Sequence, residues 1–203
     1  MHSMRPIRAR GWRTVRGSEI VESLAEGGLQ DLLGECSAIY MWKRSLRTTA
    51  EADNSPDEMM KWINSLVESP QGVVRGKRLG PFLHVTGLEL RPNSLTGPQQ
   101  ETLQRWLRQP KARRWLRNYL AQLASHTPAL YVGETTRLHR RIKEHLSGET
   151  NFGASIEGRI QWDDLDLHYY DMGESQQEDN KRRRAIEYLT NAFTIGGYTQ
   201  RPG

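Results

Sequence analysis

Three short β-prone runs, widely spaced along a chain of 203 residues, limit what this sequence can fold into. The runs cover residues 37–42, 129–133 and 165–170, and turn-forming residues such as Gly34 and Pro128 precede two of them. Helical periodicity fills most of the remaining chain. We therefore predict an α+β fold in which a small antiparallel three-stranded sheet is flanked by helices.

The spacing of these runs also predicts how the chain is divided. Residues 1–36 are expected to form an N-terminal arm and helix, and residues 37–203 one domain. That domain is interrupted by residues 44–127, an insertion with mainly helical patterns between the first two strands. Within it we expect a loop over residues 72–81 and one or two short strands over residues 82–90.

Apolar spacing predicts the helices that surround the sheet. Residues 18–33 suggest a helix broken near Gly27 and Gly28, and residues 137–146 a helix whose apolar side chains recur every four positions. A final helix is expected over about residues 178–193.

Composition narrows the class of protein. No apolar run approaches the ~18 residues needed to span a membrane, so we expect a cytoplasmic protein with no membrane partner. The single cysteine, Cys36, excludes an intrachain disulfide and a thiolate zinc cluster, so any metal would be held by oxygen or imidazole. A net charge of +5 favours an anionic partner without choosing between nucleic acid and a membrane surface.

Several polar residues that follow the β-prone runs have a spacing that suggests a catalytic site. Arg141 and His145 are four residues apart on one helix, so both side chains emerge on one face and can act on one phosphate. Gly133 ends the preceding strand and allows the chain to approach them closely. Glu187 lies at the border of the buried face of its helix, from where a carboxylate reaches a cleft.

With these residues in place, the sequence resembles the GIY-YIG nuclease superfamily. Residues 38–40 (AIY) and 131–133 (YVG) resemble the two motifs that name the family, and Arg141 lies ten residues after Tyr131. His145 and Glu187 also match the family in position and order. The likeness covers residues 37–43 and 129–203, and it is greatest to the small restriction endonucleases of the family.

Two features depart from the family pattern. More than eighty residues separate the two motif strands, which the family usually joins by a short loop. The family also commonly has an asparagine about twelve residues after the glutamate, where this chain has Thr199 and Gln200. The supporting polar role has either moved to one of these residues or been lost.

The resemblance implies a divalent-metal-dependent endonuclease that hydrolyses phosphodiester bonds in double-stranded DNA. Glu187 would hold Mg²⁺, or another divalent cation such as Mn²⁺, and Arg141 would bind the phosphate. His145 would relay a proton, and either Tyr40 or Tyr131 would act as the general base. A homodimer is compatible with this assignment.

Other interpretations of the same residues stay open. Taken singly, the tyrosines are typical of a strand core, Arg141 of a solvated helix, and Glu187 of a pair with Arg183 one turn earlier. A catalytically silent or repurposed GIY-YIG fold, serving as a nucleic-acid-binding module or in different chemistry, is the alternative function.

A basic stretch of the insertion is the candidate DNA-binding surface. Six cations lie between residues 98 and 120 against a single acidic residue, Glu101. They are Arg105, Arg108, Lys111, Arg113, Arg114 and Arg117. Two tryptophans, Trp106 and Trp115, lie among them and are expected to belong to the core.

Overall fold

The computed structural model describes residues 11–68, 73–79, 83–89, 94–158, 160–173, 183–187 and 189–190. The sheet strands and the helices that cover them are β1 (Trp12–Arg16), α1 (Gly17–Ala25), α2 (Leu29–Leu33), β2 (Ser37–Arg44), β5 (Ala129–Thr135), α7 (Leu138–Leu146), α8 (Asn151–Ile156) and β6 (Leu165–Gly173). The insertion contains α3 (Ala50–Asn54), α4 (Pro56–Glu68), β3 (Val73–Leu79), β4 (Leu83–Glu89), α5 (Gly97–Leu107) and α6 (Pro110–Leu123). Short 3-10 helices follow α6 at Ala124–His126 and precede β6 at Trp162–Asp164.

The central sheet has four antiparallel strands in the order β1-β6-β2-β5. The predicted α+β class and antiparallel pairing are confirmed, and β2 lies beside β5 despite the long insertion between them. The prediction of three strands was wrong, because residues 12–16 pair with residues 166–170 of β6 and add an edge strand. We had expected only an arm and a helix at this end, since a strand of five residues carries a weak sequence signal.

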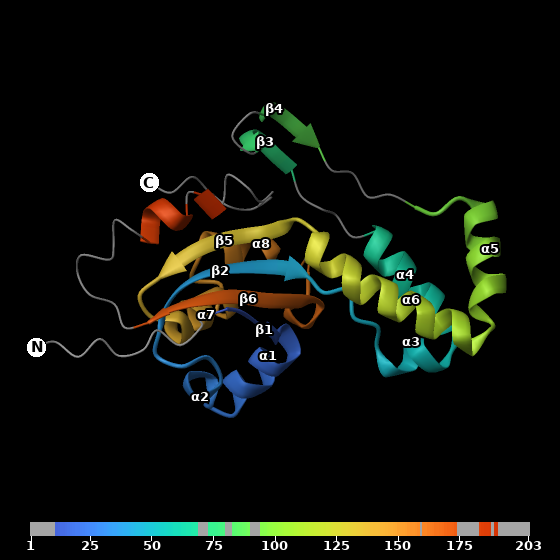
Figure 1. Ribbon diagram of the computed structural model, residues 1–203, viewed down its shortest axis with the longest axis horizontal. Helices are drawn as coiled ribbons and strands as arrows, with labels where there is room; N and C mark the ends of the chain where they lie inside the picture. Colours follow the sequence, from blue (N-terminus) through green and yellow to red (C-terminus); the bar gives the residue numbers. More distant parts are fainter. Residues whose placement is uncertain are drawn as a thin grey trace, which may run out of the picture.

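The main core lies between this sheet and its helices (Figure 1). Trp42 of β2 and Leu167 of β6 are fully buried, and α7 contributes Leu138 and Ile142 from one stripe. Because these two apolar side chains anchor α7 against the sheet, the neighbouring positions of the helix are held over the middle of β2 and β5.

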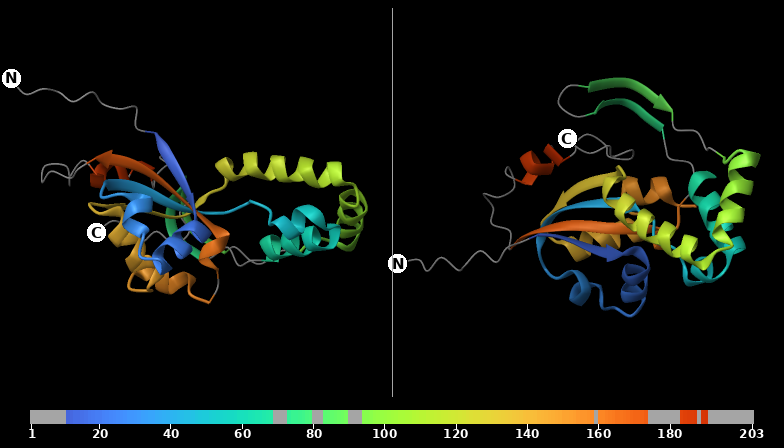
Figure 2. Two further views of the ribbon diagram at one scale, coloured as in Figure 1. Left: turned by 90° about the horizontal axis from the view of Figure 1, so that it is seen from below. Right: turned by 45° about the vertical axis from the view of Figure 1, so that its right-hand side comes forward.

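The insertion packs around a core of its own. Its centre consists of Met59 and Met60 of α4 with Ala52 and Leu107. The helices form a lobe beyond one end of the central sheet, and the β3–β4 hairpin projects away from them (Figures 1 and 2). The expected helical insertion therefore also contains a two-stranded sheet, and the loop predicted for residues 72–81 is wrong over Val73–Leu79.

The helices predicted for residues 18–33 and 137–146 are present. The break at Gly27 and Gly28 separates α1 from α2, and the helix predicted for residues 137–146 is α7. Residues 183–187 and 189–190 are helical, within the predicted final helix, whose other residues lie outside the described part. Among the described residues, no helix is both long and apolar enough to cross a membrane.

Candidate active site

Pairing of β2 with β5 brings the two motif tyrosines onto one face of the sheet. Tyr40 lies opposite Gly133, and Trp42 opposite Tyr131. Since side chains alternate along a strand, Tyr131 is a diagonal neighbour of Tyr40, and their ring centroids are 5.9 Å apart. The strand pairing that the two motifs predicted is therefore present.

Because Gly133 has no side chain, the Tyr40 hydroxyl can occupy the space next to it. A Cβ atom at position 133 would lie 2.7 Å from the Tyr40 hydroxyl oxygen and 2.7 Å from Cε1 of Tyr131. The glycine is thus required by the close approach of two aromatic rings, and the ring of Tyr40 lies directly over the backbone of β5.

We expect Gly133→Ala to displace Tyr40 and lower the free energy of unfolding by about 1–3 kcal/mol, as overpacking does in other cores. Gly97→Ala is the matched control, because a Cβ there meets nothing within 4 Å. Urea denaturation of both variants measures the effect. Equal stability of the two variants would show that the Tyr40 ring moves aside without cost.

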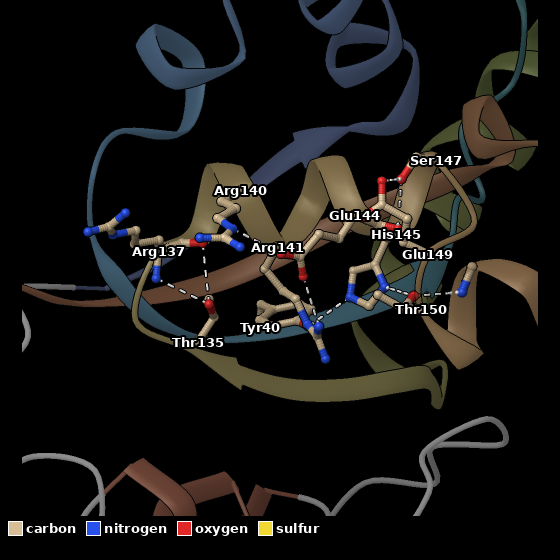
Figure 3. A network of polar contacts seen from close by, with 11 residues as sticks. Tyr40, Thr135, Arg137, Arg140, Arg141, Glu144, His145, Ser147, Glu149 and Thr150 are labelled. Atoms are coloured by element: carbon tan, nitrogen blue, oxygen red, sulfur yellow. Dashed lines mark hydrogen bonds and ion pairs between the residues drawn. The ribbon is translucent and has the colours of Figure 1, made fainter.

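His145 joins Tyr40 to the helix that follows β5. Nε2 of His145 is 2.7 Å from the Tyr40 hydroxyl, and its Nδ1 is 2.6 Å from Oγ1 of Thr150 (Figure 3). Thr150 Oγ1 also accepts a hydrogen bond of 3.0 Å from the backbone N–H of Gly153, at the start of α8. The imidazole is fully buried and is held at both nitrogens.

The pKa values of this pair are moved in opposite directions. Burial raises the pKa of Tyr40 well above its usual value, although the positive charge of Arg141 opposes the shift. Burial, followed by the charge of Arg141, lowers the pKa of His145 to about 3. At neutral pH the pair therefore consists of a neutral phenol and a neutral imidazole, with one proton between the two bonded atoms.

Arg141 lies beside this pair and is partly open to solvent. Its guanidinium is near the Tyr40 hydroxyl in Figure 3, and Nη1 donates a hydrogen bond of 2.9 Å to Glu144. Its Nε is buried and has no hydrogen-bond partner in the part of the chain that the structure describes. Arg141 also lines a cavity of about 550 Å³ formed by the end of β5, the start of α7 and residues 183–184.

Glu187 approaches the site from the C-terminal helix. One turn before it, the buried side chain of Arg183 donates a hydrogen bond of 2.9 Å to Glu134, at the end of β5. Burial and then the negative charge of Glu134 raise the pKa of Glu187 to about 7, while Arg184 and Arg141 oppose the shift. Glu187 is thus a half-buried carboxylate among these charges, although it does not line the cavity itself.

A divalent cation is compatible with the carboxylates of this region. The described residues contain no group of three or more His, Cys, Asp or Glu arranged to hold a metal. Glu187 and Glu134 supply two carboxylates from separate segments. The negative charge of Glu134 destabilises the charged form of Glu187. Hard oxygen ligands completed by water and substrate oxygens suit Mg²⁺.

The structure changes the interpretation of the insertion's cations. Arg113 is buried, with an exposed fraction of 8%. Its guanidinium donates to the backbone oxygens of Asp53, Leu107, Arg108 and Asn54 at 2.7–3.4 Å. The prediction that Arg113 binds DNA was therefore wrong, because its donors are engaged inside the insertion.

The other five cations of the set lie at the surface. Arg117 forms an ion pair of 3.1 Å with Asp53, so part of its charge is compensated within the protein. The remaining four are exposed and can face an anionic partner. These four are Arg105, Arg108, Lys111 and Arg114.

The two tryptophans of this stretch differ in burial. Trp106 is partly buried against the core of the insertion, as expected. Trp115 is 56% exposed, so its assignment to the core was wrong. It stacks on Tyr119 at a centroid distance of 5.2 Å, which leaves an aromatic pair on the outer face of α6.

Replacing Arg113 should destabilise the insertion rather than weaken DNA binding. We expect Arg113→Ala to lower the free energy of unfolding by about 2–4 kcal/mol, because it leaves buried carbonyls without donors. Arg114→Ala, at an exposed neighbouring position, should stay within about 0.5 kcal/mol of wild type. Guanidinium denaturation distinguishes the two, and equal losses would contradict the structural role of Arg113.

Sequence reasoning missed several members of the site. Glu134 directly follows the YVG motif, but only the ion pair with Arg183 reveals its contact with the C-terminal helix. Thr150 is five residues after His145, and nothing in the sequence distinguishes it from an ordinary helix cap. Thr199 and Gln200, considered as replacements for the family asparagine, lie outside the described residues.

Comparisons with protein-family models, curated proteins and solved structures gave no significant match. The functional interpretation therefore depends on the geometry of the residues themselves and on the motif resemblance.

Proposed function

We propose that this protein is a divalent-metal-dependent endonuclease that hydrolyses phosphodiester bonds in double-stranded DNA. The observation that carries the proposal is the hydrogen bond between Tyr40 and His145 beside the guanidinium of Arg141, which faces an arginine-lined cavity. This arrangement combines a route for a proton with a fixed positive charge for a phosphate. A site-specific restriction endonuclease is the narrower form of this proposal.

Arg141 is suited to bind a non-bridging oxygen of the scissile phosphate. Its ion pair with Glu144 fixes one side of the guanidinium, and the side chain remains 37% exposed for contact with substrate. Because a guanidinium presents several donors in one plane, it can hold the phosphate as charge accumulates during attack by water.

Tyr40 and His145 supply the route for the proton of the attacking water. A phenol with a raised pKa does not ionise at neutral pH, so Tyr40 takes this proton while passing its own to Nε2 of His145. Bound phosphate opposes the charge of Arg141, which makes His145 a better proton acceptor in the complex than in the free protein. Tyr131 is only partly buried, and we assign it to orienting the water or the phosphate.

Glu187 would hold the divalent cation, and Glu134, whose charge acts on Glu187, would be the second carboxylate of this region. When bound, the cation would polarise the phosphate and stabilise the departing oxygen. The exposed cations of α5 and α6 supply a second surface for the DNA backbone, independent of the reaction.

A nucleic-acid-binding module without activity is the second candidate. It is favoured by the complete burial of Tyr40, whose ring has no exposed surface in the free protein. On this alternative, the protein binds DNA through Arg141 and the insertion but no water reaches the phenol.

The test is incubation with supercoiled plasmid in Mg²⁺ and in EDTA, with Glu187→Gln purified in parallel to exclude a contaminating nuclease. Nicking or linearisation by wild type in Mg²⁺ alone supports the nuclease. DNA binding without cleavage in Mg²⁺, Mn²⁺ and other divalent ions supports the binding module.

The raised pKa of Glu187 predicts how cation binding depends on pH. A proton and a cation compete for the carboxylate, so acid must weaken binding. Below the pKa of about 7, the apparent dissociation constant should rise about tenfold per pH unit, and above it the constant should level off. Electron paramagnetic resonance of bound Mn²⁺ measures this directly.

A variant of Glu134 identifies the cause of that pH dependence. Glu134→Gln removes the negative charge that contributes to the raised pKa, so the midpoint should move to lower pH. A midpoint that stays at the same pH in this variant would show that burial alone raises the pKa, and a midpoint near the ordinary glutamate value in wild type would contradict the assignment of the cation to Glu187.

A further inference from the structure

The cavity beside Arg141 contains more positive charge than one scissile phosphate requires. Five arginines and two glutamates line it, together with Thr135 and Thr136. Tyr40, Tyr131 and His145 do not line it, so the cavity is a space next to the proton route. Its volume of about 550 Å³ lies within the range of pockets that bind small ligands, about 300–1,000 Å³.

Three of the five arginines form ion pairs with the two glutamates. Arg140 and Arg141 share Glu144, at 3.1 and 2.9 Å, and Arg183 pairs with Glu134 at 2.9 Å. No ion pair joins Arg137 or Arg184 to a carboxylate within the described part of the chain. These two guanidiniums come from different elements and line the same cavity. The charge of Arg184 also acts on Glu187, but neither guanidinium is held in an ion pair among the described residues, so both can contact a ligand.

The charges of this cavity favour an anion with several oxygens. Two guanidiniums on opposite segments offer planar sets of donors, which match the tetrahedral oxygens of a phosphate group. The positive end of the α7 helix dipole adds to this field, because Arg137 immediately precedes Leu138. A volume of about 550 Å³ is also enough for a phosphate group together with the sugar attached to it.

We propose that Arg137 and Arg184 bind a second phosphate of the substrate strand, next to the phosphate that Arg141 holds. The site rests on the proposed function, since it makes the cavity part of the DNA-binding surface. Holding two consecutive phosphates fixes the direction in which the strand crosses Tyr40, and therefore the side on which water attacks. Arg137 and Arg184 are positioning residues in this account.

The test is binding of a 5′-hydroxyl DNA duplex in EDTA, which separates affinity from cleavage. We expect the double variant Arg137→Gln/Arg184→Gln to bind about tenfold more weakly than wild type at moderate salt. The slope of log affinity against log salt should fall by about one, as for the loss of one phosphate contact. Arg16→Gln/Lys61→Gln is the matched control, because it removes two exposed, ion-paired cations elsewhere.

Titration with inorganic phosphate and with a nucleoside monophosphate distinguishes the source of the phosphate. The proposal predicts that neither ligand binds wild type as tightly as the duplex does. Tight binding of a free phosphate that the double variant loses, with unchanged duplex affinity, would overturn it. Unchanged affinity and salt slope in the double variant would also overturn it.

Failure of the second phosphate site and failure of the proposed nuclease function give different results. If wild type binds DNA without cutting it and the double variant binds more weakly, the nuclease proposal fails and the second phosphate site stands. If wild type cuts DNA and the double variant binds it with wild-type affinity, the site fails and the nuclease stands. Arg184→Lys adds a check on geometry, since it keeps the charge and should restore only part of the affinity.

Discussion

Glu187→Gln is expected to lower the rate of DNA cleavage by about a hundredfold to a thousandfold while leaving DNA affinity nearly unchanged. Glutamine has almost the same shape as glutamate, but its neutral amide cannot neutralise a divalent cation. The variant also removes a carboxylate whose charged form is disfavoured by burial and by Glu134. We therefore expect the folded protein to be at least as stable as wild type at neutral pH.

Single-turnover cleavage, DNA binding in EDTA and thermal unfolding together test this prediction. Glu22→Gln, at an exposed position of α1, is the matched control and should resemble wild type in all three. Near-wild-type cleavage by Glu187→Gln would remove Glu187 from the proposed metal site. Loss of folding would instead show that its carboxylate is structural.

Arg141→Lys is expected to lower cleavage by about a hundredfold. Lysine can keep the ion pair with Glu144 and the positive charge, but its ammonium cannot hold two phosphate oxygens through a planar fork. The loss of rate at saturating protein should therefore exceed the loss of DNA affinity.

Arg16→Lys is the control for this substitution. Arg16, at the end of β1, forms an ion pair with Glu19 of α1 at the same sequence spacing as Arg141 with Glu144. Its replacement should leave cleavage within about twofold of wild type. If Arg141→Lys also stays within a few-fold, Arg141 is a structural residue of α7.

The sequence predicted the structure best where a local pattern of residues determines it. The stripe containing Leu138 and Ile142 predicted α7, and strand alternation predicted the buried face of β6. The motif around Gly133 predicted that β2 and β5 pair, and the close approach of Tyr40 now gives the physical reason for the glycine. The helix and the strand face depend on neighbouring residues, which periodicity describes well, whereas the pairing of β2 with β5 joins distant residues and was predicted only from the resemblance of the two motifs.

Features that depend on distant contacts were not predictable from the sequence. Strand β1 is identified by its pairing with β6, 150 or more residues later. Arg113 and Arg114 are adjacent and identical in type, but only the fold places one beneath backbone carbonyls and leaves the other in solvent. The contact between Glu134 and Arg183 likewise joins residues far apart in the chain.

The source of the oxygen in the cleaved DNA tests the central claim most directly. Wild type and Glu187→Gln are incubated with DNA and Mg²⁺ in ¹⁸O-labelled water, and the terminal phosphates are analysed by mass spectrometry after a single turnover. If water attacks the phosphodiester at this site, wild type should place one ¹⁸O in each new terminal phosphate, and the variant should yield almost no product. Equal product from both proteins, or no cleavage of any DNA in any divalent cation, would contradict the account.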